Sequence, residues 1–250
     1  MKYGYMPTFK ADIFSEIAFA KKYFDFIEIT LKPDLSIYSP EYITEIRQAL
    51  DSFTVMGHMH WEINLSGKDI SEIGKTIKSA EIFEKLGAKK ITIHPSSDEN
   101  QKTEQVKENN IYALSELTSK RKALFLLENT AHAPFNQART ILGITSRINS
   151  LITLDTSHAG VSRAELDNFI ALLGKQIGHV HLSDSTASTH HLFFRDKKKI
   201  KNIFDAFESI KYNGTLTLEM FYKNSKKEQL PVVKRRKLLL DQMKMIEILA

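Results

Sequence analysis

The sequence predicts an α/β fold in which eight parallel strands, each followed by a helix, close into a single (β/α)8 barrel. Strand-like and helix-like stretches alternate along the whole chain, without a Pro/Gly/Ser-rich linker between them. The length of 250 residues is usual for such a barrel, so we expect one domain over residues 1–250. Six of the short apolar stretches also end in a His, Asp or Glu. An open, doubly wound sheet is the structural alternative.

The first half of the chain supplies four of the expected strand–helix units. Ser39 followed by Pro40 is typical of a helix start, and Gly87 after Leu86 is typical of a helix end. The first strand has the weakest signal. In order, the expected elements are Tyr3–Met6, Asp12–Tyr23, Phe26–Thr30, Pro40–Leu50, Phe53–Met56, Ile70–Leu86, Lys90–Ile93 and Val106–Leu117.

The second half continues the alternation, with Asn213-Gly214 as the predicted stop after the seventh helix. The helix after the fifth strand is expected to be short, and the last helix is long and ends near Leu249. In order, the other elements are Ala123–Leu127, Phe135–Leu142, Leu151–Leu154, Ala164–Leu173, Ile177–Val180, Ile200–Ile210 and Thr215–Leu218.

Titratable residues lie at or just after the ends of the predicted strands. Because the carboxyl ends of parallel strands meet on one face of a barrel, we expect these residues to lie close together. These residues are His58, His94, Glu128, Asp155, His158, His181, Asp184 and Glu219. Side chains alternate along a strand, so the residues two positions earlier should also point inward. They include three Thr and His179, whereas the alternate positions are uniformly apolar. Crowded imidazoles and carboxylates predict a site for a divalent metal.

The composition narrows the class of protein. No cysteine is present, so a metal must be held by His, Asp and Glu. No apolar run approaches membrane length, and we expect a soluble, cytoplasmic protein with no membrane partner. The net charge of +5 and the pI near 9.1 have two explanations. The protein could attract phosphate groups, or its helices could simply expose many lysines to solvent.

The order of short motifs resembles the xylose isomerase-like TIM-barrel superfamily, which contains sugar (phosphate) isomerases and epimerases and the endonuclease IV family (AP endonuclease family 2). The resemblance covers essentially the whole chain. Its pieces are His58 with Ile63-Asn64-Leu65, Ile93-His94-Pro95, Leu127-Glu128-Asn129-Thr130, Leu154-Asp155-Thr156-Ser157-His158, His181-Leu182-Ser183-Asp184-Ser185 and Leu218-Glu219.

The resemblance to the isomerases and epimerases implies one divalent ion, Zn, Mn, Mg or Co, held by Glu128, Asp155, His181 and Glu219. Such an ion polarises neighbouring oxygens of a sugar or sugar phosphate and stabilises the enediolate. Glu128 and Glu219 would then be the catalytic acid and base. Relatives often form homo-oligomers.

The resemblance to endonuclease IV implies instead two or three zinc ions and cleavage of abasic DNA. Its additional ligands match His58, His94, His158 and His191. Thr189 stands where that family has an Asp, and Leu192-Phe193-Phe194-Arg195 replaces a glycine-containing turn. The four-ligand set is complete and the three-ion set is not, so we favour the isomerase or epimerase.

Several residues have open roles. His58, His94 and His158 are candidates for metal or substrate binding, Trp61 for stacking on substrate, and Arg195 for a phosphate. His179 is expected to be a hydrogen-bonded core residue, and His132 and His190 to be ordinary loop histidines. A non-catalytic barrel that binds a ligand is a third hypothesis.

Overall fold

The computed structural model describes residues 1–8, 11–63, 65, 70–96, 102–160, 163–224, 226–227 and 230–249. In this part of the chain, eight parallel strands form a closed barrel in the order β1-β10-β7-β6-β5-β4-β3-β2. The barrel closes where Lys2 of β1 pairs with Thr215 of β10. The strands are β1 (Lys2–Tyr5), β2 (Phe26–Thr30), β3 (Thr54–His58), β4 (Lys90–Ile93), β5 (Leu124–Glu128), β6 (Leu151–Asp155), β7 (Ile177–Leu182) and β10 (Thr215–Leu218).

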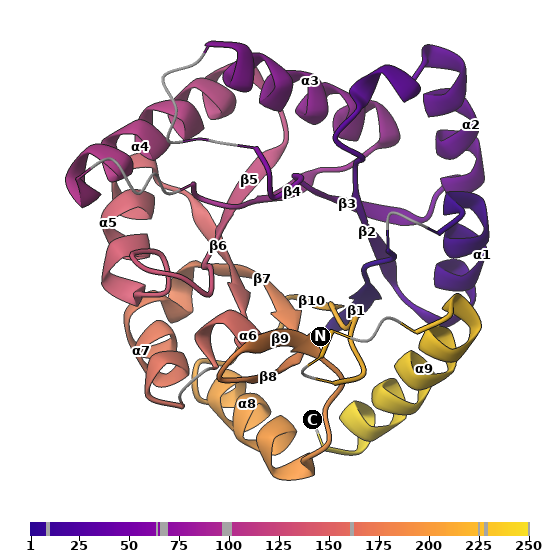
Figure 1. Cartoon of the computed structure of the whole chain (residues 1–250), viewed down its shortest axis with the longest axis vertical. Coiled ribbons are helices and arrows are strands. Elements are labelled where there is room, and N and C mark those ends of the chain that lie inside the picture. Colours follow the sequence, from indigo (N-terminus) through magenta and orange to yellow (C-terminus); the bar gives the residue numbers. More distant parts are fainter. Residues whose placement is uncertain are drawn as a thin grey trace.

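The helices surround the strands as an outer ring, as expected for a (β/α)8 barrel (Figure 1). The larger helices are α1 (Ile13–Tyr23), α2 (Pro40–Leu50), α3 (Ile70–Leu86), α4 (Thr103–Lys120), α5 (Ala138–Ile148), α7 (Arg163–Leu173), α8 (Lys197–Ser209) and α9 (Val232–Leu249). Short helical turns are α6 (Thr156–Ala159), η1 (Leu35–Ile37) and η2 (Gly174–Gln176). No helix of the described residues combines the length and apolarity needed to cross a membrane.

The predicted alternation of side chains along the strands is confirmed. The outward residues belong to the large core between strands and helices; examples are Val55, Ile91 and Leu216. The barrel interior holds a separate small cluster of Phe26, Met56 and Leu126. The remaining inward positions are polar and pair with one another: the Thr92 and Thr153 hydroxyls are 2.9 Å apart, and His179 Nε2 is 3.0 Å from Thr217 Oγ1.

The helix caps predicted at Ser39 and Gly87 are confirmed. The Ser39 hydroxyl accepts a hydrogen bond from the Tyr42 N–H at 3.2 Å, at the start of α2. Gly87 takes φ = +96° after α3, in the left-handed region that favours glycine. Helix α8 ends at Ser209, one residue before the predicted end at Ile210, and Asn213-Gly214 lies between this helix and β10. Lys211 takes φ = +55°, and its N–H donates to the Glu208 carbonyl just after the end of the helix.

Helix α5 also differs from its predicted bounds of Phe135–Leu142. Phe135 is buried in a turn, where its carbonyl accepts from the Thr130 N–H at 3.1 Å, and the helix begins only at Ala138. The apolar spacing continues through Ile144, so the helix runs on to Ile148 and ends at Asn149 with φ = +48°.

A β-hairpin that the sequence analysis did not predict follows β7. It consists of β8 (Asp184–Thr186) and β9 (Thr189–Leu192), which pair antiparallel. The segment after it, Phe193-Phe194, is buried, and the Phe194 N–H donates to Gln242 Oε1 of α9 at 2.9 Å. The residues that replace the glycine-containing turn therefore anchor the hairpin to the core.

Candidate metal centre

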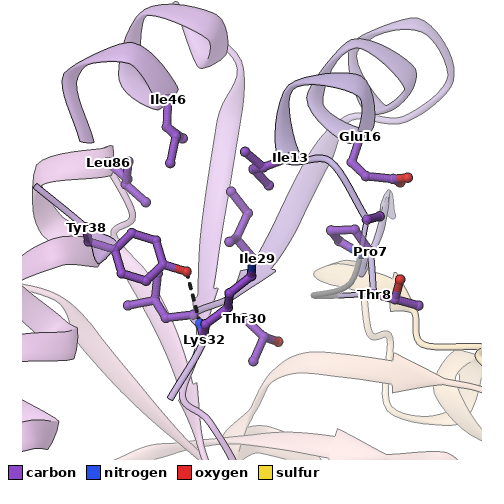
Figure 2. A pocket seen from close by; sticks show the side chains of 12 residues that line it. Pro7, Thr8, Ile13, Glu16, Ile29, Thr30, Lys32, Tyr38, Ile46 and Leu86 are labelled. Atoms are coloured by element: carbon purple, nitrogen blue, oxygen red, sulfur yellow. Dashed lines mark hydrogen bonds between the residues drawn. The ribbon is translucent and has the colours of Figure 1, made fainter. Parts of the chain in front are cut away.

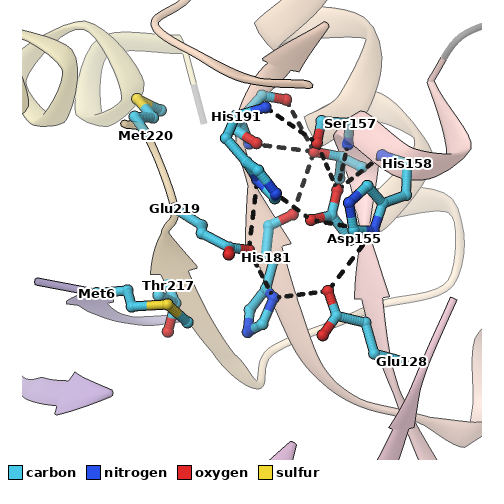
Figure 3. Close-up of polar contacts among 12 residues, drawn as sticks. Met6, Glu128, Asp155, Ser157, His158, His181, His191, Thr217, Glu219 and Met220 are labelled. Atoms are coloured by element: carbon cyan, nitrogen blue, oxygen red, sulfur yellow. Dashed lines mark hydrogen bonds and ion pairs between the residues drawn. The ribbon is translucent and has the colours of Figure 1, made fainter. Parts of the chain in front are cut away.

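The four residues predicted to hold a metal meet at the carboxyl ends of their strands. Glu128 and Asp155 are the last residues of β5 and β6, His181 is the second-last residue of β7, and Glu219 directly follows β10. Each offers one ligand atom, and these atoms all lie within 4.8 Å of one another. The first three side chains are fully buried and Glu219 is 5% exposed. Figure 3 shows these side chains pointing toward one another.

Asp155 uses its two carboxylate oxygens differently. Its Oδ1 accepts from the N–H groups of Ser157 and His158, at 2.6 and 2.8 Å, and so caps the short helix α6. Its Oδ2 has no hydrogen-bond partner among the described residues. The cap fixes the carboxylate and leaves the second oxygen facing the cluster. Burial opposes ionisation, but the charges of His158 and His191 outweigh it and lower the pKa of Asp155.

Glu128 lies between three imidazoles. Its Oε2 is 2.8 Å from His94 Nε2 and 3.2 Å from His58 Nε2, and its Oε1 is 3.0 Å from His181 Nδ1. Burial alone would raise its pKa, but the charges of His94 and His181 prevail and hold the pKa of Glu128 well below its usual value. The carboxylate is therefore ionised at neutral pH.

His181 is oriented from inside the barrel by Glu28. Its Nε2 lies 3.1 Å from the carboxylate of Glu28, which also bonds His179 Nε2 at 3.0 Å and the Thr217 hydroxyl at 2.6 Å. Burial works against a charged imidazole, but Glu28, Glu128 and Glu219 together raise the pKa of His181 well above its usual value. His179 is fully buried and hydrogen-bonded, which confirms its predicted place in the core.

The surroundings of Glu219 disfavour ionisation of its carboxyl group, whereas those of Glu128 favour it. Its Oε2 is 2.9 Å from His181 Nδ1, but burial dominates and raises the pKa of Glu219 to about 7. The two glutamates of the cluster, which both lie beside His181 Nδ1, therefore favour different protonation states.

Two buried atoms of the cluster indicate that a cation fits there. Asp155 Oδ2 and His191 Nδ1 lack a hydrogen-bond partner in the part of the chain that the structure describes, and they lie 3.8 Å apart. Glu219 Oε2, which contacts His181 Nδ1, is 3.7 Å from the same His191 nitrogen. Unsatisfied polar atoms in such burial are costly, and a divalent cation would satisfy both.

The additional histidines surround this cluster. His58, Glu128 and His181 form a second group of atoms close enough to share an ion. His158 Nδ1 lies 2.9 Å from the Asn129 carbonyl and 3.6 Å from Asp155 Oδ2. His190 is not the ordinary loop histidine that was predicted. Its ring packs against His158 and His191, with centroids 4.7 and 4.3 Å away.

A cavity of about 470 Å³ opens over the cluster. It is lined by His58, His94, His158, Trp61 and Lys227, among others. Trp61 is 51% exposed and stacks on the His60 ring at 4.0 Å. The size suits a small molecule.

Arg195 does not lie with the other predicted substrate contacts. Its guanidinium donates to the Lys223 carbonyl at 3.0 Å, and the residue is not part of the cavity lining. The structure therefore does not support its predicted role in binding a phosphate. Lys227 is the cationic side chain that the described chain brings to this cavity.

A much smaller cavity, about 40 Å³, adjoins the first (Figure 2). The two share Pro7, Thr8 and Thr30 in their walls. Its other side is largely apolar, and the Tyr38 hydroxyl accepts from the Lys32 N–H at 3.0 Å. None of the four predicted metal ligands lines it.

The sequence analysis missed one positioning residue. Asn129 joins the ends of β5 and β6: its Oδ1 accepts from the Asp155 N–H at 2.8 Å, and its Nδ2 donates to the Asp155 carbonyl at 3.0 Å. Its position directly after Glu128 in the sequence is the signal that could have identified it. Asn64, part of another motif, lies outside the described residues.

The chain is similar to solved structures over its whole length. A D-psicose 3-epimerase from Clostridium cellulolyticum H10, solved with D-tagatose, matches with a TM-score of 0.82 and 19% identity, over 100% of this chain and 99% of that chain. Endonuclease IV from Thermus thermophilus matches with a TM-score of 0.74 and 18% identity, over 99% and 100%. A 3-keto-D-glucoside 4-epimerase from E. coli matches with a TM-score of 0.73 and 14% identity, over 98% and 99%. At these identities the likeness shows the fold alone.

None of the curated proteins compared matches the sequence. The family model described as "Xylose isomerase-like TIM barrel" matches residues 17–247, which is most of the chain. The closed eight-stranded barrel agrees with that match. The chain therefore belongs to the xylose isomerase-like TIM barrel family.

Proposed function

We propose that the protein is a divalent-metal-dependent isomerase or epimerase, acting by proton transfer on a sugar, sugar phosphate or related hydroxy-carbonyl compound. The observation that carries the proposal is the complete set of Glu128, Asp155, His181 and Glu219 around one point at the barrel mouth. The cavity of about 470 Å³ above it has the size of a small-molecule site.

The four side chains would hold a Zn, Mn, Mg or Co ion, which when bound polarises adjacent carbonyl and hydroxyl oxygens of the substrate. His181 is prepared for this role, because Glu28 keeps a hydrogen bond to Nε2 and leaves Nδ1 toward the cluster. Asp155 is prepared by the cap that occupies only Oδ1.

The proton transfer is proposed for Glu128 and Glu219. They extend from β5 and β10, which lie on opposite sides of β7 and β6 in the barrel order. One carboxyl group would accept a proton from a carbon next to a carbonyl, and the other would return a proton to the substrate. The charge of the bound ion would govern the pKa values of both groups during this exchange.

Substrate hydroxyl groups would meet His58, His94 and His158, which line the cavity. The exposed face of Trp61 can cover the apolar face of a sugar ring. Lys227, at the cavity wall, favours substrates with an anionic group such as a phosphate.

Solvent deuterium incorporation tests the proposal. Metal-loaded protein in D₂O should introduce deuterium at a carbon next to the carbonyl of at least one member of a panel of ketoses and sugar phosphates. Glu128→Gln should abolish the exchange, and His132→Ala, at an exposed residue of the same cavity, should retain it. Absence of exchange with every substrate, in protein shown to carry metal, would contradict the proposal.

The second candidate is an endonuclease IV-like zinc phosphodiesterase that cleaves abasic DNA. One observation favours it: His58 and His94 both contact Glu128 Oε2, so that this carboxylate can bridge two ions. Zinc-loaded protein would then cut a duplex at an abasic site, with salt-sensitive binding. Intact duplex after incubation with fully zinc-loaded protein excludes this candidate.

A further inference from the structure

Arg235 of α9 is a buried cation beside the end of β10. Its side chain is only 4% exposed. The neighbouring Arg236 forms an ion pair with Glu16, but among the described residues no carboxylate lies at ion-pair distance from Arg235. Burial lowers the pKa of Arg235 to about 10, so its guanidinium stays charged at neutral pH. A charge buried without an ion-pair partner is costly, so stability alone gives no reason for an arginine here.

The guanidinium of Arg235 joins the ends of two strands. Its Nε donates to the Met220 carbonyl at 2.9 Å, and its Nη2 donates to the Met6 carbonyl. Met6 directly follows β1, and Met220 comes directly after Glu219 at the end of β10. These two strands pair where the barrel closes. The planar fork of an arginine can bond acceptors on two segments at once, which a lysine ammonium does not reproduce.

Two aromatic rings enclose the same guanidinium. Its central carbon lies 5.0 Å from the ring centroid of Phe221 and 5.7 Å from that of Tyr5. Such contacts gain strength where water is excluded. Met6 and Phe221 both line the main cavity. Arg235 therefore contacts the two segments that form one wall of that cavity.

Glu219 is the proposed ligand whose carboxylate has the least support of its own. The carboxylate of Asp155 is fixed by backbone N–H groups, and the ring of His181 is fixed by Glu28. Within the described chain, the carboxylate of Glu219 accepts from no backbone N–H, and its contacts are with imidazoles. Its direction therefore depends on its backbone, whose N–H bonds β7 and whose next carbonyl bonds Arg235.

We propose that Arg235 is a positioning residue of the metal centre, which fixes the end of β10 so that the carboxylate of Glu219 faces the ion. Its positive charge also offsets part of the negative charge that the carboxylates of the centre bring together. This role rests on the four-ligand centre of the proposed function, because Arg235 itself touches neither the ion nor the substrate. It makes the last helix a part of the site, although that helix carries none of the ligands.

Manganese affinity tests this role, because Mn favours a centre rich in carboxylates. Arg235→Gln should bind manganese about 10–100-fold more weakly than the wild type, by competition titration against a chelator. Arg236→Gln is the matched control, because Arg236 is the next residue and donates to Ser15 and Glu16 of α1 rather than to a strand end. We expect both variants to have a lower Tm, and only the first to lose affinity when both are folded by circular dichroism.

Two results of this titration would overturn the proposal. Wild-type affinity in Arg235→Gln, whatever its Tm, would show that the arginine only stabilises the fold. An equal loss of affinity in Arg236→Gln would show that the effect follows from lower stability and not from the ends of β1 and β10.

Arg235→Lys covers the case in which the Gln variant fails to fold. It keeps the charge but cannot bond both carbonyls in the arginine geometry, so we expect a smaller, measurable loss of manganese affinity. Wild-type affinity in Arg235→Lys would contradict the joining of the two strand ends. Wild-type protein that binds manganese but exchanges no deuterium would contradict the proposed function alone, whereas protein that binds no manganese would contradict both.

Discussion

His181 and Glu28 are bonded across the interior of the barrel, although 153 positions separate them in the chain. The imidazole Nε2 lies 3.1 Å from both carboxylate oxygens, and both side chains are fully buried. The positive charges of His181 and His179 outweigh the effect of burial and keep the pKa of Glu28 well below its usual value. The bond fixes the ring so that Nδ1 faces Glu128 and Glu219.

Replacing Glu28 should therefore weaken metal binding without removing a ligand. Glu28→Gln takes away the charge that orients His181, and we expect a loss of about 10–100-fold in metal affinity. Competition titration against a chelator measures it. Glu16→Gln is the matched control, because Glu16 is a buried carboxylate that pairs with Tyr5 and Arg236 and is outside the cluster. Equal affinity in Glu28→Gln and the wild type would contradict the positioning role.

Metal uptake should release protons. The pKa of Glu219 is about 7 and that of His181 is raised well above its usual value, so both groups carry protons near pH 6 that a bound ion would displace. Affinity should rise as pH increases, by about tenfold per pH unit for each proton released. Calorimetry in buffers of different ionisation enthalpy counts these protons. Metal binding that is independent of pH between pH 6 and 8 would be inconsistent with this account.

The metal-free protein should lose stability as pH rises, partly because of Glu219. Its folded-state pKa of about 7 exceeds the ordinary value of 4.5, so between these values the folded state holds a proton that the unfolded state lacks. The resulting stabilisation is complete below 4.5 and is lost as pH rises through 7. Glu219→Gln cannot titrate, and the drop in its Tm from pH 5 to pH 8 should be smaller by a few degrees. An equal drop in both proteins would show that Glu219 is not the group responsible.

The small cluster of Phe26, Met56 and Leu126 inside the barrel should contribute strongly to the free energy of unfolding. Leu126 is fully buried with Phe26 and Met56, below the ends of the strands that carry the site. Leu126→Ala should lower the free energy of unfolding by about 2–5 kcal/mol, because it leaves a cavity. Chemical denaturation measures the change. Leu172→Ala, at a residue that is 42% exposed, should cost less than about 1 kcal/mol. A similar loss of unfolding free energy in the two variants would contradict this role of the cluster.

The barrel and its main cluster could be predicted from the sequence because both depend on local patterns. Strand alternation separates inward from outward residues, so the spacing along the chain suffices to place Thr153 and Ile152 on opposite faces. Glu128, Asp155, His181 and Glu219 lie at the carboxyl ends of their strands, and closure of the barrel brings those ends together. The resemblance to the isomerases and epimerases selected these four among the titratable residues at the strand ends.

What the sequence could not predict depends on contacts between distant segments. His190 looked like a loop residue, because the β8–β9 hairpin has no strong turn signal and is held by Gln242 and by the loop after β10. Arg195 lies shortly after this hairpin, and its guanidinium donates to the Lys223 carbonyl rather than lining the cavity. Such positions follow from tertiary packing and not from the spacing of residues along the chain.

Anomalous X-ray diffraction from crystals of zinc- or manganese-loaded protein tests the central claim most directly. The account predicts an anomalous peak bonded to Glu128, Asp155, His181 and Glu219 at the mouth of the barrel. A metal-loaded crystal with no peak between these four side chains would contradict it.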